Sequence, residues 1–150
     1  MAHSFTNLLY HLVFSTKERQ PWLDADMRPR LFPYLGGLVR EEGGVALIVN
    51  GVADHVHLLV KLRPDRAVAD VLRALKAGSS FWVHKTFPDH EHFAWQTGYG
   101  AFSVSQSQVE RVHSYIQRQE EHHRARPFRD EFTALLRAHG MQLREEEMWD

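Results

Sequence analysis

The sequence predicts an α+β protein of the ferredoxin-like sandwich class, in which an antiparallel sheet has its helices packed on one face. Short β-rich segments alternate with segments of helical periodicity in the order strand, helix, strand, strand, helix, strand. The length of 150 residues, with 43% hydrophobic and 25% charged, fits one globular domain. We therefore expect one domain over 1–150, with a core over residues 8–140 and a loosely held acidic tail over 141–150.

Three predicted strands and one helix occupy the first part of the chain. Residues 10–15 (YHLVFS) are a short β-rich run. A helix is predicted over 24–42 from the spacing of its leucines, although Pro33 should kink it or delay its start. Residues 45–52 and 55–62 follow as two strands joined by a tight turn.

The second part of the chain contains the remaining elements. Residues 68–87 have one apolar stripe and predict a helix, and residues 99–103 predict a strand. A further helix is expected over 107–124, where Ser and Glu have the spacing of a capping box. Residues 128–139 form a short amphipathic helix that ends at a glycine. In this class of fold, the face of the sheet opposite the helices is free for a ligand or a partner.

Composition excludes several classes of protein. No apolar run is long enough to span a bilayer, and the first residues lack the pattern of a secretory signal. Cysteine is absent, which excludes disulfides and thiolate metal sites and suits a cytoplasmic location. The 11 histidines leave imidazole and oxygen as the donors for any metal. With a net charge of −1, DNA binding would depend on a local patch rather than on the charge of the whole protein.

A histidine pair on the third predicted strand is the first candidate site. Side chains alternate along a strand, so His55 and His57 share one face while Val56 and Leu58 take the other. The apolar residues should then enter the core and both imidazoles should lie on the open face. Two such imidazoles can chelate a divalent ion if a third ligand comes from elsewhere. The alternative is a pair of ordinary, half-exposed strand histidines.

A tyrosine on the helix predicted over 107–124 is the second candidate. Tyr115 lies at the margin of the apolar stripe, and Gln119 and His123 follow on the same side at i+4 and i+8. A phenol has a pKa near ~10 and is a poor nucleophile until a metal or a base assists it. A helix can thus carry a nucleophile beside a metal ligand. The alternative is a packing tyrosine and a solvated glutamine.

Two stretches together resemble a known family. Residues 54–59 (DHVHLL) look like the HUH signature of histidine, hydrophobe, histidine. Residues 114–123 (SYIQRQEEHH) look like the tyrosine helix of the small single-tyrosine HUH transposases of IS200-like insertion sequences, to which the REP-associated tyrosine transposases are related. Further matches lie before and between these stretches, and the likeness spans about residues 8–140 in the expected order.

The resemblance implies a specific chemistry. Tyr115 would be the nucleophile that forms a 5′-phosphotyrosine bond, and His55 and His57 would bind Mg²⁺ or Mn²⁺. Gln119 would be the third ligand, with His123 as a further imidazole that replaces or joins it. The substrate would be single-stranded DNA beside an imperfect hairpin, which the protein cleaves and rejoins. The family also implies a homodimer whose composite sites place the tyrosine of one subunit against the histidines of the other.

Basic and aromatic residues supply candidates for DNA contact. Phosphates could be neutralised by a set of lysines and arginines on the helices predicted over 68–87 and 107–124: Arg73, Lys76, Lys85, Arg118 and Arg124. Three aromatics could stack on unpaired bases, although a place in the core is the favoured prediction for them: Trp95, Tyr99 and Phe102. Two other functions stay open, namely a domesticated protein that binds DNA hairpins without transposition, and a metal-dependent hydrolase that uses a metal-bound water.

Overall fold

The structure is a computed structural model that describes residues 3–121 and 126–142. Its sheet is antiparallel and has the strand order β2–β3–β1–β4. The strands run over Leu8–Ser15 (β1), Val45–Gly51 (β2), His55–Leu62 (β3) and Gly100–Val104 (β4). This order and the sequence of strands and helices are those of the ferredoxin-like class, so the predicted fold class is confirmed. The predicted strand ends agree with the structure to within two residues.

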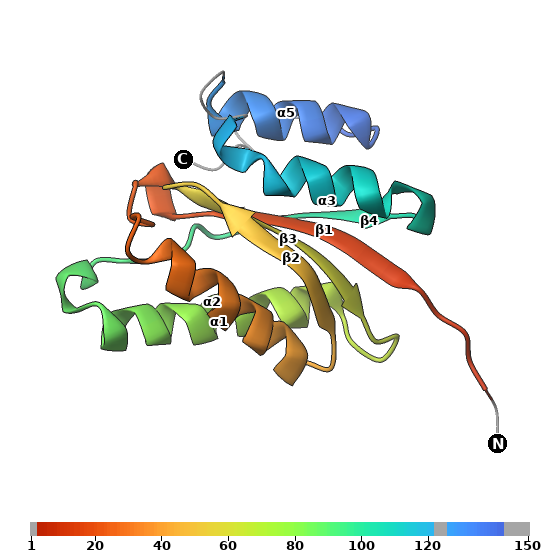
Figure 1. The fold of residues 1–150 in the computed structure, drawn as a ribbon, viewed down its shortest axis with the longest axis horizontal. Coiled ribbons are helices and arrows are strands. Elements are labelled where there is room, and N and C mark those ends of the chain that lie inside the picture. Colours follow the sequence, from red (N-terminus) through yellow and green to blue (C-terminus); the bar gives the residue numbers. More distant parts are fainter. Residues whose placement is uncertain (1–2, 122–125, 143–150) are drawn as a thin grey trace.

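Helices α1 (Arg28–Glu41) and α2 (Val68–Thr86) pack side by side on one face of the sheet (Figure 1). The main core lies between them and the sheet, and its fully buried members include Phe14, Leu58 and Leu75. Helix α1 begins at Arg28 rather than at residue 24. Asp24 accepts the backbone N–H groups of the next turn, but Pro29 has no N–H to donate to the carbonyl of residue 25, so that turn is not continuous with the regular helix. Pro33 lies inside α1 with its ring exposed, so water can reach the carbonyl that loses its helical partner.

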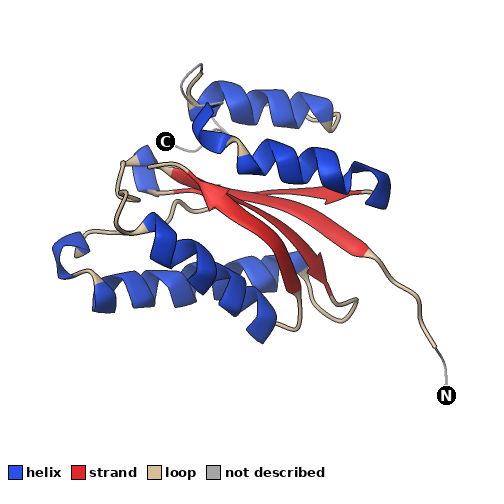
Figure 2. Ribbon diagram, in the orientation of Figure 1, coloured by secondary structure: helices blue, strands red, loops and turns tan. Residues whose placement is uncertain are grey.

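The opposite face of the sheet is covered, and the prediction of a free face is wrong. Helices α3 (Val109–Gln117) and α5 (Phe128–Ala138) lie over it (Figure 2). The apolar side chains on that face of β1 and β4 require cover from water, and α5 supplies it. A second, smaller core results, whose buried members are Val13, Phe102, Phe128, Phe132 and Leu136.

The helix predicted over 107–124 is interrupted. A 3-10 turn over Gln106–Gln108 precedes α3, and no side chain caps the start of α3. The helix ends at Gln117, and Arg118 leaves helical geometry with φ −101° and ψ 31°. Asn50 on β2 holds this end, because its Nδ2 donates to the carbonyls of Ile116 at 2.9 Å and Gln117 at 3.1 Å. The predicted continuation over 122–124 lies outside the described residues.

The segment 94–98 runs beside the end of β1. Trp95 forms an antiparallel bridge with Thr16, and the backbone N–H of Gln96 donates to the carbonyl of Ser15 at 2.9 Å. This segment therefore extends the edge of the sheet towards the His55 end of β3, since Ser15 pairs with His55. Within the described ranges, no helix has the length and apolar character required to cross a bilayer. Most of the predicted acidic tail, residues 143–150, lies outside those ranges.

Candidate functional site

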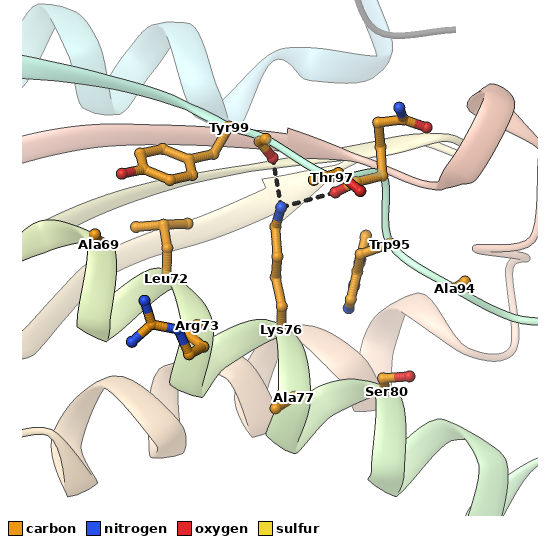
Figure 3. A pocket seen from close by; sticks show the side chains of 12 residues that line it. Ala69, Leu72, Arg73, Lys76, Ala77, Ser80, Ala94, Trp95, Thr97 and Tyr99 are labelled. Carbon is orange, nitrogen blue, oxygen red and sulfur yellow. Dashed lines mark hydrogen bonds between the residues drawn. The ribbon is translucent and has the colours of Figure 1, made fainter.

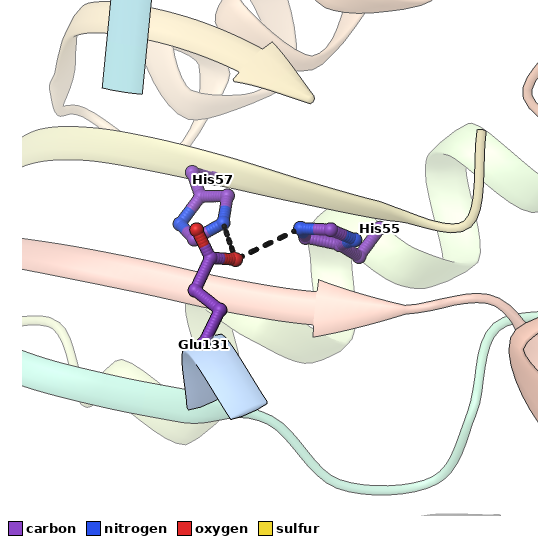
Figure 4. Close-up of side chains that lie close together, drawn as sticks. All are labelled: His55, His57 and Glu131. Carbon is purple, nitrogen blue, oxygen red and sulfur yellow. Dashed lines mark hydrogen bonds and ion pairs between the residues drawn. The ribbon is translucent and has the colours of Figure 1, made fainter. Parts of the chain in front are cut away.

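Strand β3 places two imidazoles on the face beneath α3 and α5. His55 and His57 point to this face, while Val56 and Leu58 point into the main core, as the alternation predicts. Both histidines are fully buried, so the expected open face and the alternative of half-exposed strand histidines are both wrong. The Nε2 atoms of both rings lie 3.1 Å from the same oxygen, Oε1 of Glu131 (Figure 4).

Each of these imidazoles has a second partner that sets the orientation of its ring. Nδ1 of His55 lies 2.7 Å from Oδ1 of Asp54, and Nδ1 of His57 lies 2.8 Å from Nε2 of His11. Burial lowers the pKa of His11 well below its ordinary value, and the neighbouring His57 lowers it further. A neutral His11 can accept the Nδ1–H of His57. Both partners thus leave Nε2 directed at Glu131, an arrangement found around metal-ligating histidines.

Glu131 lies at the centre of the site and was not predicted from the sequence. It projects from α5 and is fully buried. Its Oε1 meets both histidines, and its Oε2 accepts hydrogen bonds from the Tyr115 hydroxyl and from Gln119 Nε2 at 3.2 Å. One sequence signal could have found it. Glu131 stands three residues after Phe128, on the apolar stripe of an amphipathic helix, where a charged side chain requires buried partners.

Tyr115 reaches the site from α3. Its hydroxyl donates to Oε2 of Glu131, and its ring lies 5.9 Å from the ring of His57. Burial raises the pKa of Tyr115 far above its ordinary value, and the negative charge of Glu131 raises it further. The phenol therefore keeps its proton in this arrangement. Activation of the oxygen requires a positive charge nearby, a base that takes the proton, or both.

Gln119 completes the cluster. Its side chain is fully buried, yet its Oε1 has no hydrogen-bond partner among the described residues. An unsatisfied buried oxygen beside two imidazoles and a carboxylate is a donor set suited to a divalent cation. Ligand atoms of His55, His57 and Glu131 all lie within 4.8 Å of one another. His123, the alternative ligand, lies outside the described residues.

A cavity of about 650 Å³ opens beside Tyr115. It lies between β4, α3 and α5, and its lining includes His11, Arg111 and His139. Arg111 is exposed at its rim, where a guanidinium can meet a phosphate. The cavity supplies a route from solvent to the tyrosine in a site whose candidate metal ligands are buried.

The structure brings four of the predicted site residues together, namely Tyr115, His55, His57 and Gln119. The candidate DNA-binding residues do not form one patch around them. Arg73, Lys76 and Lys85 lie on α2, on the other side of the sheet, and Arg118 is exposed at the end of α3. Arg124 lies outside the described residues. Of the three aromatics, Phe102 and Trp95 pack inside as predicted, whereas Tyr99 is 37% exposed.

The fold and the site together define a class of protein in which a ferredoxin-like sheet carries a histidine pair on a central strand and a covering helix turns a tyrosine towards it. The chain belongs to the family of IS200-like transposases, since the model of the family described as "Transposase IS200 like" matches residues 4–119. The resemblance found in the sequence is thereby confirmed. Membership in a transposase family implies cleavage and transfer of DNA strands.

Individual relatives agree with this assignment. The chain is 26% identical to the ISDra2 transposase TnpA of Deinococcus radiodurans over 117 residues. These aligned residues cover 75% of this chain and 84% of the relative. A crystal structure of a protein from Deinococcus radiodurans R1 is similar with a TM-score of 0.66 at 26% identity, over 79% of this chain and 95% of that one. The structure of a REP-associated tyrosine transposase bound to a REP hairpin has a TM-score of 0.60 at 12% identity, over 82% of this chain and 72% of that one. This last likeness shows the fold alone.

Proposed function

We propose that this protein cleaves and rejoins single-stranded DNA at hairpin-bearing ends, with Tyr115 as the nucleophile and a divalent metal as cofactor. One observation carries the proposal. A single buried carboxylate, that of Glu131, contacts the Tyr115 hydroxyl through one oxygen and Nε2 of both histidines through the other. The nucleophile and the metal-binding atoms therefore face one point. A structural neighbour bound to a REP hairpin supports a substrate of the same kind.

The metal-binding residues in this proposal are His55, His57, Glu131 and Gln119. Two imidazole nitrogens, a carboxylate oxygen and the unpaired Gln119 Oε1 suit Mg²⁺ or Mn²⁺, with Glu131 added to the ligands expected from the sequence. When bound, the ion polarises the phosphodiester and neutralises the charge that develops on it. Asp54 and His11 hold the two rings so that Nε2 remains available.

The residues of the chain supply the proton transfer and the new bond. Tyr115 Oη attacks the phosphorus, and its proton passes to Oε2 of Glu131, which already accepts it in a hydrogen bond. A bond forms between Oη and phosphorus, and the bond from phosphorus to the 3′ oxygen breaks. The leaving 3′ oxygen takes up a proton from water and becomes a hydroxyl. The 5′-phosphotyrosine keeps the energy of the bond, so attack by another 3′-hydroxyl seals a new junction without ATP.

One chain contains the whole set of groups, and we propose that it acts in cis. Tyr115 reaches the carboxylate that meets the histidines of its own chain. The composite site of a homodimer, with tyrosine and histidines from different subunits, stays a prediction from the resemblance. Mixing His57→Ala protein with Tyr115→Phe protein distinguishes the two arrangements. A cis site gives no recovery of cleavage, whereas a trans site regains part of it in heterodimers.

The test is adduct formation. The protein, Mn²⁺ and end-labelled hairpin DNA are incubated, and a protein–DNA adduct that resists denaturation is expected. Tyr115→Phe should abolish the adduct, while Tyr34→Phe, which removes a hydroxyl beneath the other face of the sheet, should not. A mobility shift without an adduct would support the alternative of a hairpin-binding protein without transposition. Turnover that survives Tyr115→Phe but not His57→Ala would support the metal-dependent hydrolase.

A further inference from the structure

A second cavity, of about 530 Å³, lies on the other side of the sheet from Tyr115. Helix α2 forms one wall and the segment 94–99 forms the other (Figure 3). The cavity does not belong to the site described above, since none of that site's residues lines it. The residues that line it therefore need their own explanation.

The walls combine an apolar surface, an aromatic ring and a cation. Leu72 and Ala69 provide the apolar surface, and the ring of Tyr99 lies at the side (Figure 3). The ammonium of Lys76 donates to the carbonyls of Gln96, at 2.8 Å, and Gly98. Among the described residues these two carbonyls are its acceptors, so one of its three N–H donors is left for a ligand.

The charge of the cavity selects the kind of ligand. Lys76 and Arg73 both line it, and none of the described residues that line it is acidic. Arg73 forms an ion pair with Asp70 at 2.8 Å, so Lys76 is the cation on which recognition of a ligand depends. Nζ of Lys76 also lies 5.9 Å from the centre of the Tyr99 ring, so the cation and the ring border the same part of the cavity. A flat, apolar ligand with acceptor atoms on its edge fits this combination. A nucleobase has both properties, since it stacks on aromatic rings and accepts hydrogen bonds from lysine.

The cavity also lies close to the catalytic end of the sheet. The Gln96 N–H donates to the Ser15 carbonyl, and Ser15 pairs with His55 on the next strand. Neighbouring strands are about 4.8 Å apart, so the segment lies roughly 10 Å from the backbone of His55. Strand β4 is an edge strand, and DNA that leaves the catalytic face can pass around this edge.

We propose that this cavity holds one unpaired nucleobase of the DNA strand that flanks the cleaved phosphate, stacked on Tyr99 and hydrogen-bonded through an acceptor atom to Lys76. The inference rests on the proposed function, because it takes the substrate to be single-stranded DNA beside a hairpin. It also assigns a role to the exposure of Tyr99. A ring predicted for the core instead presents a surface to solvent at the mouth of a cavity.

A double-mutant cycle between protein and DNA tests the inference. The probe is a fluorescent hairpin with a single-stranded flank in which each nucleotide in turn is made abasic. We expect one abasic position to weaken binding roughly 5- to 100-fold, the range for stacking of one base on an aromatic ring. Tyr99→Ala should weaken binding of the intact hairpin by a similar factor and leave the affinity for that abasic hairpin unchanged. Tyr99→Phe keeps the ring and should bind as the wild type does.

The matched control is Phe81→Ala, which removes an aromatic ring that is 70% exposed on α2 but does not line the cavity. Additive losses from Tyr99→Ala and the abasic position would overturn the inference, as would the absence of any sensitive position or of hairpin binding. The failure of the proposed chemistry is separate. If the coupling is found but no Tyr115 adduct forms, the nucleobase cavity stands and the nuclease proposal falls. If a normal adduct forms but no coupling is found, the nuclease proposal stands and the nucleobase cavity falls.

Discussion

Replacing Glu131 with glutamine removes one negative charge and one proton acceptor while it keeps the length and shape of the side chain. Oε1 of the carboxylate lies 3.1 Å from Nε2 of both His55 and His57, while Oε2 accepts hydrogen bonds from Gln119 Nε2 at 3.2 Å and from the Tyr115 hydroxyl. A glutamine has one oxygen in place of two, so it cannot present an oxygen to the imidazole nitrogens and to the phenol at once. The substitution therefore separates the nucleophile from the metal-binding atoms.

The size of the effect follows from the two roles proposed for this side chain. Loss of a positioned general base slows a reaction by about 10²- to 10⁴-fold, and we expect adduct formation by Glu131→Gln to fall within that range. Weaker metal binding should add to the loss at low Mn²⁺ concentration. Binding of the hairpin should change little, since Glu131 is fully buried and contacts side chains of its own chain.

The assay is single-turnover adduct formation over a titration of Mn²⁺, with thermal unfolding measured in parallel to show that the variant folds. Glu110→Gln is the matched control, because it removes an exposed carboxylate from the first turn of α3. Wild-type rates of adduct formation in Glu131→Gln at every Mn²⁺ concentration would refute the reasoning. The carboxylate would then be a structural partner of the histidines without a part in the reaction.

Three further predictions concern the residues that support the two sites. His11→Leu removes the partner of His57 Nδ1 and should weaken Mn²⁺ binding about 10- to 100-fold in calorimetry. Burial lowers the pKa of Lys76 to about 8, so its proton, and with it the charge offered to DNA, is present below that pH and lost above it. Hairpin affinity measured by anisotropy should therefore fall as the pH rises through about 8, and Lys76→Arg should remove this fall because arginine stays charged. Asn50→Ala removes the donor that ends α3 and should lower the free energy of unfolding by about 1 kcal/mol in urea, with weaker metal binding through displacement of Gln119.

Each of these predictions has a control in the chain. His92→Leu changes an exposed histidine remote from the metal-binding atoms and should leave Mn²⁺ affinity as it is. Lys85→Arg alters an exposed lysine of α2 and should leave the pH dependence of hairpin binding unchanged. Gln117→Ala changes an exposed side chain at the same helix end but keeps the carbonyl that Asn50 contacts. Equal effects in a variant and its control would contradict the role assigned to the variant residue.

The parts of the site that the sequence predicts are those set by local periodicity. Alternation along β3 places His55 and His57 on one face, and helical spacing places Tyr115 and Gln119 on one side of their helix. Both patterns act over a few residues. The alternation holds in the structure, whereas α3 ends at Gln117, before Gln119, and the side chains of Tyr115 and Gln119 meet at Glu131 across that break. The order of strands and helices is a pattern of the same kind, and it defines the fold class.

The parts that the sequence does not predict depend on contacts between distant residues. Glu131 is 76 positions from His55, and no local pattern relates the two. The end of α3 depends on Asn50, which lies 66 positions from Ile116. The expectation of a free face also failed for this reason, because a short amphipathic helix does not reveal which surface it will cover.

The sheet has buried side chains on both of its faces, and this has a consequence for how the chain folds. If the pairing of β1 and β3 slipped by one residue, Val56 and Leu58 would face α3 and α5, and both imidazoles would enter the main core beneath α1 and α2. Such a mispaired molecule would lose stability and metal binding in the same event. The register of β3 is therefore selected twice, because the one pairing that buries the apolar side chains in the main core also places both imidazoles in the candidate site.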